Sequence, residues 1–215
     1  MLAQRMIHVY IADSEAVSRK YKLELFSRKL PESERERAHR YKNAQDAYNF
    51  ILGRLLLKDA LVRMNMAVSI EQINYLESGK PFLKNVSFNI SHSVDRVVCA
   101  IAAQGTIGVD IEKERSLVLE NFKPWFTGSE WQHICSADKT GDLFYWYWTR
   151  KESIIKALGI NLSDLHKIEL DPAQGFFNHG GQHYYLNDLD IGNHYYGAVC
   201  SQVENAHVEF VYPEF

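Results

Sequence analysis

The sequence is poor in cysteine and has no long hydrophobic run. Its three cysteines, Cys99, Cys135 and Cys200, are widely spaced, so we expect free thiols rather than disulfides or a metal centre. No apolar run approaches the roughly eighteen residues that a membrane helix needs. The N-terminal segment turns polar too early for a signal peptide. These absences predict a cytoplasmic protein that has no membrane partner.

Charge of one sign is not in large excess either. The formal net charge of −3 argues against a broad nucleic-acid surface, which normally shows a basic excess. Any basic site must therefore be local. With 46% hydrophobic residues in 215, the chain can bury a substantial core, in one domain or in two small ones. We expect a globular monomer that does not bind nucleic acid.

Two long helices are indicated by apolar residues at helical spacing. Asn43 can cap the first helix, which runs to about Met64. The second covers about residues 142–158 and ends at Gly159. Alternating segments predict strands at 6–12, 86–90, 97–103, 106–112, 166–170, 183–186, 194–200 and 207–212. Each half of the chain then holds one long helix followed by strands, which predicts an α+β fold without an evident sequence repeat.

The segment IGVDIE, residues 107–112, carries the first candidate carboxylates. Side chains alternate between the faces of a strand, so Asp110 and Glu112 project together while the aliphatic residues bury the other face. A turn at residues 104–105 can join this strand to the preceding one as an antiparallel hairpin. We expect both carboxylates on one exposed face at the end of that hairpin.

The segment WTRKESIIKALG, residues 148–159, carries a third carboxylate and a lysine. Trp148, Glu152 and Lys156 recur at every fourth position and therefore share one stripe of a helix. Trp148 is expected in the core or at the wall of a pocket. Carboxylate oxygens suit magnesium rather than zinc, and no histidine or cysteine cluster has zinc-ligand spacing. Three carboxylates beside a lysine suit a magnesium-bound phosphate ester.

Other short motifs precede the acidic ones. A basic segment with Arg37 and Arg40 comes first, followed by GKP at residues 79–81 and FNISHS at residues 88–93. In this order, from about residue 35 to 160, the motifs resemble the 4'-phosphopantetheinyl transferase superfamily, and more closely its Sfp-type branch. The resemblance implies two similar α+β halves, related by a pseudo-twofold axis, with the active site between them.

The same resemblance assigns a role to each half. It places the boundary near residues 104–106. Residues 1–104 are expected to form an N-terminal half on the nucleotide side of coenzyme A. Residues 105–215 are expected to form a C-terminal half that carries the metal-binding and catalytic motifs.

Individual residues also receive roles from the resemblance. Magnesium, for which manganese can substitute, is expected on Asp110, Glu112 and Glu152. Glu152 is also the candidate to accept a proton, and Lys156 is expected to balance phosphate charge. Contacts to coenzyme A are expected from Arg37, Arg40, Lys80, Ser91, His92 and Lys156, with Ser91 in a loop that offers hydroxyl and N–H groups to an anion.

Three positions have other expectations. Some relatives carry a further basic residue where this chain has Tyr48 and Asn49, which leaves the detailed nucleotide contacts open. Arg54 lies in an apolar helix and is expected to pack or to form an ion pair. The stretch from Phe126 to Glu130 resembles a family segment and is expected to be architectural or to face the acceptor.

The reaction implied by the resemblance is the transfer of 4'-phosphopantetheine from coenzyme A to a serine of an acyl, polyketide or peptidyl carrier protein. Adenosine 3',5'-bisphosphate would be released. A magnesium-dependent hydrolase of a nucleotide or coenzyme A pyrophosphate stays open, with water in the acceptor position. A non-catalytic carrier-binding module is the other alternative, although Asp110, Glu152 and Lys156 are all present. The identity of the carrier cannot be read from the sequence.

Overall fold

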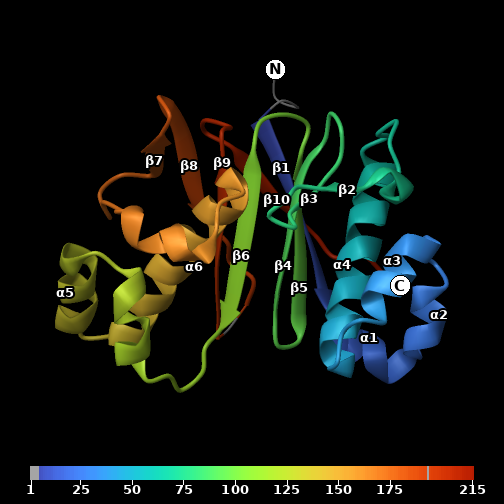
Figure 1. Ribbon diagram of the computed structural model, residues 1–215, viewed down its shortest axis with the longest axis horizontal. Helices are drawn as coiled ribbons and strands as arrows, with labels where there is room; N and C mark the ends of the chain where they lie inside the picture. Colours follow the sequence, from blue (N-terminus) through green and yellow to red (C-terminus); the bar gives the residue numbers. More distant parts are fainter. Residues whose placement is uncertain (1–4, 193) are drawn as a thin grey trace. The chain divides into compact units, whose positions relative to one another are not determined.

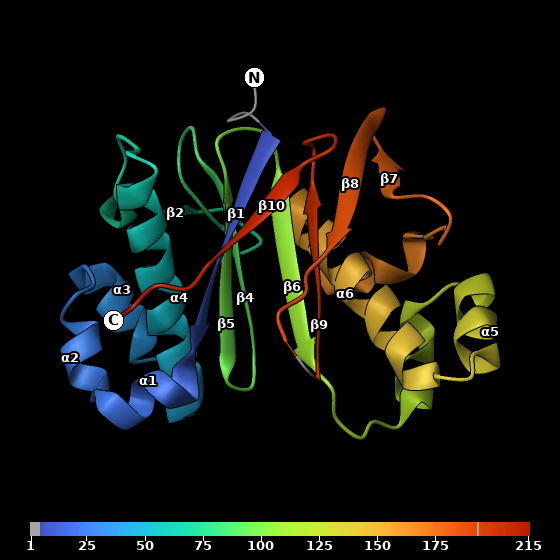
Figure 2. The ribbon, with the colours of Figure 1, turned by 180° about the vertical axis from the view of Figure 1, so that it is seen from behind.

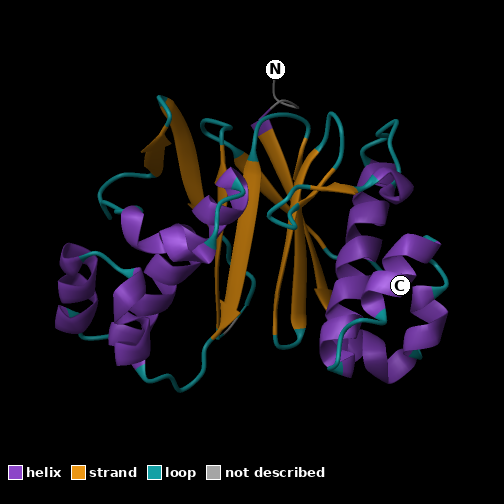
Figure 3. Ribbon diagram, viewed as in Figure 1, coloured by secondary structure: helices purple, strands orange, loops and turns teal. Residues whose placement is uncertain are grey.

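The computed structural model describes residues 5–192 and 194–215, and its fold is α+β, which confirms the predicted class (Figures 1 and 3). The chain forms two compact units. The first contains the residues up to Gln104 together with His207–Phe215, and the second contains Gly105–Ala206. Each unit has a four-stranded sheet and one long helix. Within the described residues, no helix has the length and apolarity needed to cross a membrane.

The sheet of the first unit combines strands from both ends of the chain. Its order is β10 (His207–Val211), β1 (Met6–Asp13), β5 (Arg96–Ala102) and β4 (Ser87–Ser93). β1 runs parallel to β10 and antiparallel to β5, which is antiparallel to β4. Figure 2 shows β10 in red beside β1 in blue.

Helix α4 (Ala44–Arg63) packs on one face of this sheet (Figure 1). The Asn43 side chain accepts a hydrogen bond from the Gln45 N–H, which confirms the predicted cap. Apolar side chains of α4 form the core of the unit with residues of β1, β4 and β5. The shorter elements are α1 (Ser14–Lys20), α2 (Leu23–Ser27), α3 (Glu32–Ala38), the 3₁₀ helix η2 (Ile70–Gln72), and the paired strands β2 (Asn74–Tyr75) and β3 (Pro81–Phe82).

The sheet of the second unit is antiparallel throughout. Its order is β6 (Ile107–Lys113), β9 (Tyr195–Ser201), β8 (Gln182–Asp188) and β7 (Phe176–His179). Helix α6 (Thr140–Leu158) packs against β6 and β9. It ends at Gly159, which has a left-handed φ of 71° and confirms the predicted helix end. The 3₁₀ helices η3 (Leu119–Trp125) and η4 (Leu162–Lys167) and the helix α5 (Gly128–Ser136) complete the unit.

The predicted hairpin between the strands on either side of residues 104–105 is wrong. β5 lies inside its sheet, and both of its edges are already paired, with β1 and with β4. It therefore has no edge to offer β6, which pairs with β9. The last strand exists as predicted, but its partner β1 places it in the sheet of the first unit rather than in the C-terminal half.

The strand predicted at residues 166–170 is also wrong. This segment contains the end of η4 and an irregular stretch. Ile168 and Leu170 are buried, and this alternation mimics a strand. Two side chains take the place of a partner strand: Lys151 Nζ donates to the Ile168 carbonyl, and Glu130 accepts from the Leu170 N–H. These bonds satisfy buried backbone groups without a ladder.

Candidate active site

Strand β6 and helix α6 approach each other closely because a glycine lies at their contact. A Cβ atom at Gly108 would lie 2.1 Å from the Ser153 carbonyl oxygen and 2.3 Å from the Ala157 nitrogen. Asp110 lies on the same face of the strand as Gly108 and is only 4% exposed. The expectation of an exposed Asp110 is therefore wrong, since α6 covers the face that alternation alone marks as open. Glu112, nearer the end of the strand, is half-buried.

The acidic side chains of β6 meet Glu152 and Lys156 of α6. Lys156 Nζ lies 2.6 Å from Asp110 Oδ1. Burial lowers the pKa of Lys156, but the carboxylates of Asp110 and Glu152 outweigh it and raise that pKa above its ordinary value. Burial, followed by the charge of Asp110, raises the pKa of Glu152 to about 7, and Glu112 adds to the rise. These four residues, Asp110, Glu112, Glu152 and Lys156, form what we call the acidic cluster.

The donor set of the acidic cluster fits a hard divalent cation. Carboxylate oxygens are preferred ligands of magnesium. Burial and then the charge of Asp110 raise the pKa of Glu152, and a bound cation would favour the ionised form of that carboxyl. Asp110, Glu112 and Glu152 are the residues that would hold it. As the side chains stand in the described part of the chain, no group of three or more His, Cys, Asp or Glu residues is arranged so that it could hold a metal ion.

A second ion pair, not found by the sequence analysis, fixes α6 against α5. Lys151 Nζ lies 2.5 Å from Glu130 Oε2, and both side chains are only 1% exposed. Glu130 also forms a capping box with Thr127 at the start of α5. The stretch that contains Glu130 is thus architectural. The T-x-x-E pattern at residues 127–130 signals this cap, whereas nothing in the sequence marks Lys151 as buried.

Trp148 is half-buried and packs against the core of the second unit. Its ring stacks on Phe144, with centroids 5.9 Å apart, and packs against Phe122 and Phe126. Of the two expectations for Trp148, the core position is the one that these contacts support. The stripe of α6 therefore divides into an apolar anchor at Trp148 and a charged end at Glu152 and Lys156.

Ser91 and His92 lie in the first unit, within strand β4. The expectation of a loop around Ser91 is wrong, because the β4–β5 ladder continues to the pair Ser93 and Arg96. Ser91 is buried, whereas the side chain of His92 is exposed.

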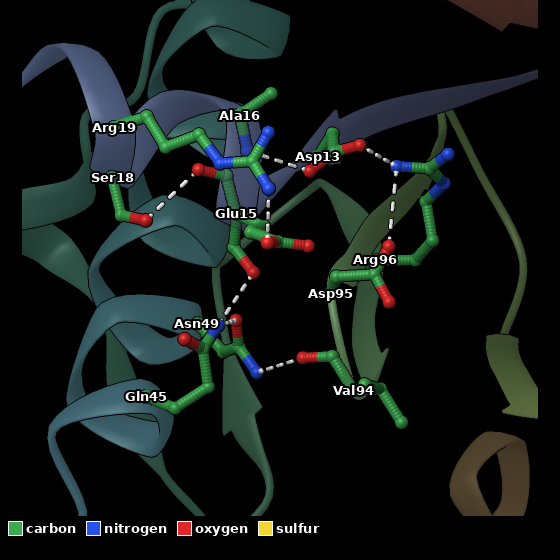
Figure 4. Close-up of polar contacts among 11 residues, drawn as sticks. Asp13, Glu15, Ala16, Ser18, Arg19, Gln45, Asn49, Val94, Asp95 and Arg96 are labelled. Carbon is green, nitrogen blue, oxygen red and sulfur yellow. Dashed lines mark hydrogen bonds and ion pairs between the residues drawn. The ribbon is translucent and has the colours of Figure 1, made fainter.

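The turn that follows His92 is held by polar contacts (Figure 4). Asn49 Nδ2 donates to the Val94 carbonyl at 3.2 Å, and Arg96 pairs with Asp13. Val94 has a φ of 53°, a left-handed value that is uncommon for a β-branched residue. Tyr48, beside Asn49, is buried, and its hydroxyl donates to the Tyr21 carbonyl. Tyr48 and Asn49 thus both support the fold of the first unit.

The basic residues expected to bind coenzyme A also lie in the first unit. Arg37 is half-buried in the last turn of α3, and its guanidinium carbon lies 3.7 Å from the centre of the Tyr75 ring. Arg40 is exposed just beyond α3. Lys80 is half-buried and follows Gly79, whose φ of 81° makes the turn before β3.

Arg54 has the structural role expected of it. Its Nε lies 2.5 Å from Glu34 Oε2, and the two side chains are 6% and 3% exposed. The pair joins α4 to α3, the helix that carries Arg37.

Both units match known families. Residues 106–202 match the 4'-phosphopantetheinyl transferase superfamily. Residues 17–104 match the family described as 4'-phosphopantetheinyl transferase, N-terminal. Together the two matches span all the motifs discussed above.

Individual relatives agree with these matches. The chain is 32% identical over 203 residues to 4'-phosphopantetheinyl transferase Sfp of Bacillus subtilis (strain 168), with 87% of each chain covered. It is 37% identical over 127 residues to 4'-phosphopantetheinyl transferase gsp of Aneurinibacillus migulanus, with 56% of this chain and 52% of the relative covered. It is also 32% identical over 164 residues to L-aminoadipate-semialdehyde dehydrogenase-phosphopantetheinyl transferase of Rattus norvegicus, covering 67% of this chain and 53% of the relative. The chain is therefore a transferase that belongs to the 4'-phosphopantetheinyl transferase superfamily and is of the Sfp type.

Proposed function

We propose that this enzyme transfers 4'-phosphopantetheine from coenzyme A to a serine hydroxyl of an acyl, polyketide or peptidyl carrier protein. Adenosine 3',5'-bisphosphate leaves. Support comes from the relatives named as phosphopantetheinyl transferases. The observation that carries the proposal is the acidic cluster, in which Lys156 contacts Asp110 and Glu152 has a pKa of about 7.

In this proposal each residue of the acidic cluster has a part. Asp110, Glu112 and Glu152 hold magnesium, or manganese in its place, and the ion neutralises pyrophosphate charge when bound. Glu152 also accepts the proton of the carrier serine, directly or through water, as a general base. Lys156 stabilises charge on the transferring phosphate. The second unit supplies these residues, and the enzyme needs no nucleophile of its own.

The first unit binds the nucleotide end of coenzyme A in this proposal. Arg37, Arg40 and Lys80 supply cationic groups for its phosphates. His92, exposed on a strand whose following turn is fixed, faces the phosphates as a donor. Ser91 is buried within β4, so in this proposal it does not contact coenzyme A and only supports the neighbouring His92.

The proposal is tested by the release of adenosine 3',5'-bisphosphate, followed by chromatography. Release should require coenzyme A, magnesium and an apo carrier protein together. Asp110→Ala and Glu152→Gln should each slow it about a thousandfold, the scale of a lost metal ligand. Asp138→Ala, at an exposed position of the same unit, is the matched control and should keep the wild-type rate.

Each alternative has its own outcome in this assay. Release without any carrier protein would favour a pyrophosphate hydrolase. Carrier binding without release would favour a non-catalytic module. Full activity in the presence of a chelator would remove magnesium from the account.

A further inference from the structure

We propose that Tyr75 is a positioning residue for coenzyme A: its ring holds the Arg37 guanidinium in the orientation that receives the ribose phosphate. This inference rests on the proposed function. It goes further in two respects. It gives a role to a residue outside the family motifs, and it assigns the ribose phosphate to Arg37 rather than to Arg40.

The stacking geometry preserves the donors of Arg37. Its guanidinium carbon lies 3.7 Å from the centre of the Tyr75 ring, a cation–π contact in which the ring occupies one face of the planar group. The N–H groups lie in the plane of the guanidinium, so stacking leaves its edge available to bond two oxygens of an acceptor such as phosphate. Stacking also restricts the rotamers of Arg37 before coenzyme A binds, which lowers the entropic cost of ordering this long side chain on binding.

The Tyr75 ring is itself fixed by a buried ion pair. Its hydroxyl donates to Glu34 Oε1 at 2.7 Å and accepts from Arg54 Nη2 at 3.2 Å. Glu34 and Arg54 are paired and buried. Glu34 lies on α3 three residues before Arg37, so one helix supplies both the anchor of the ring and the arginine that the ring holds.

Tyr75 also neighbours the turn that carries Lys80. Tyr75 pairs with Pro81 between β2 and β3, and the Leu76 N–H donates to the Lys80 carbonyl at 2.9 Å. One short strand therefore contacts α3 through its side chain and the GKP turn through its backbone. Arg40, exposed beyond the end of α3, lies outside this arrangement.

The test compares the binding of coenzyme A and dephospho-coenzyme A by calorimetry. Tyr75→Leu removes the ring and should weaken coenzyme A binding by about threefold to tenfold, the range of a partly desolvated cation–π contact. Binding of dephospho-coenzyme A should stay within about twofold, because only the ribose phosphate meets Arg37. Tyr75→Phe keeps the ring but loses the hydroxyl contacts that fix it, so its coenzyme A affinity should fall between those of the wild type and Tyr75→Leu, and it should unfold at a lower temperature.

A double-mutant comparison of Tyr75 and Arg37 shows whether Tyr75 positions Arg37 or only stabilises the fold. In an Arg37→Ala background, Tyr75→Leu should cause no further loss of affinity, because the two residues act as one unit. Arg40→Ala, which removes the same charge from the exposed turn, should weaken coenzyme A binding less than Arg37→Ala. Should Tyr75→Leu not fold, Arg37→Lys serves instead. It keeps the charge without the planar stack and should lose coenzyme A affinity by a similar factor.

Several results would overturn the inference. One is that Tyr75→Leu loses equal affinity for coenzyme A and dephospho-coenzyme A, and another is that it still loses affinity in the Arg37→Ala background. Unchanged coenzyme A affinity in Arg37→Lys would also overturn it, as would a larger loss of affinity in Arg40→Ala than in Arg37→Ala. A wild-type protein that binds no coenzyme A would instead contradict the proposed function itself. The two failures are therefore distinguishable.

Discussion

Glu152 owes its raised pKa to its surroundings. Burial is the first cause and the negative charge of Asp110 the second, while Lys156 opposes them. A carboxyl in this state carries an electrostatic cost whenever it is ionised without a compensating cation. The same residue should therefore weaken the fold of the metal-free protein at neutral pH.

Glu152→Gln should stabilise the protein at pH 8 when a chelator removes divalent ions. The folded pKa of about 7 exceeds the ordinary value of 4.5, so the folded state holds a proton that the unfolded state has lost between these values. In the wild type, the contribution of the Glu152 carboxyl to the free energy of unfolding is therefore present at low pH and is lost as the pH rises through about 7. The variant lacks that loss and should be more stable at pH 8 by roughly 3 kcal/mol, since the pKa difference corresponds to about 1.4 kcal/mol per unit.

Thermal unfolding at pH 5 and pH 8 measures this difference. The advantage of Glu152→Gln should be small at pH 5 and largest at pH 8. Glu120→Gln makes the same chemical change at an exposed position and is the matched control. An advantage that does not grow with pH would mean that Glu152 is not held in a site that penalises its charge.

The contact between β6 and α6 aligns the acidic cluster. Asp110 comes from the strand, whereas Glu152 and Lys156 come from the helix. Gly108 sets how closely the two elements approach. A shift between them would change the distance of 2.6 Å between Lys156 Nζ and Asp110 Oδ1.

Gly108→Ala should therefore disrupt both stability and activity. The new Cβ atom would meet the backbone of Ser153 and Ala157 rather than a mobile side chain, so we expect a loss of about 3 kcal/mol, the upper end for overpacked cores. Urea unfolding measures the loss, and bisphosphate release should fall with it. Gly141→Ala, on α6 with nothing within 4 Å of the added atom, should be neutral or stabilising. Equal behaviour of the two variants would contradict this account of the contact.

Local signals in the sequence predicted the long elements well. The Asn43 side chain accepts a hydrogen bond from a backbone N–H in the first turn of α4. The Gly159 N–H donates to a backbone carbonyl in the last turn of α6. Both signals act within a few residues and can therefore be read from the sequence. The partner of β6 was not predictable in this way, since β9 lies far along the chain. The burial of Asp110 depends on the same kind of distant contact, because α6 covers it.

The sequence predicted which residues form the candidate site, but it did not predict which other residues hold them in position. The carboxylates and Lys156 stand in recognisable motifs, and the structure brings them together. Lys151 lies within the segment of residues 148–159, but nothing in that segment marks its structural role, and Tyr75 lies in no motif. Their importance comes from partners such as Glu130 and Arg37, which no spacing rule connects.

At the scale of the whole molecule, each unit has its own core and its own group of candidate residues. The basic residues proposed to bind coenzyme A, Arg37, Arg40 and Lys80, lie in the first unit, and the acidic cluster lies in the second. Family matches cover both units. A transferase that handles a nucleotide-bearing donor and a protein acceptor needs both kinds of group, which is the central claim of the proposed function.

Intact-mass spectrometry of the carrier protein tests that claim most directly. The wild-type enzyme, incubated with coenzyme A, magnesium and apo carriers of the fatty-acid, polyketide and peptide types, should add one phosphopantetheine unit to at least one of them. The same carrier with its serine changed to alanine should keep its mass. If every carrier stayed unmodified while adenosine 3',5'-bisphosphate accumulated, the enzyme would be a hydrolase and the account given for the acidic cluster would be contradicted.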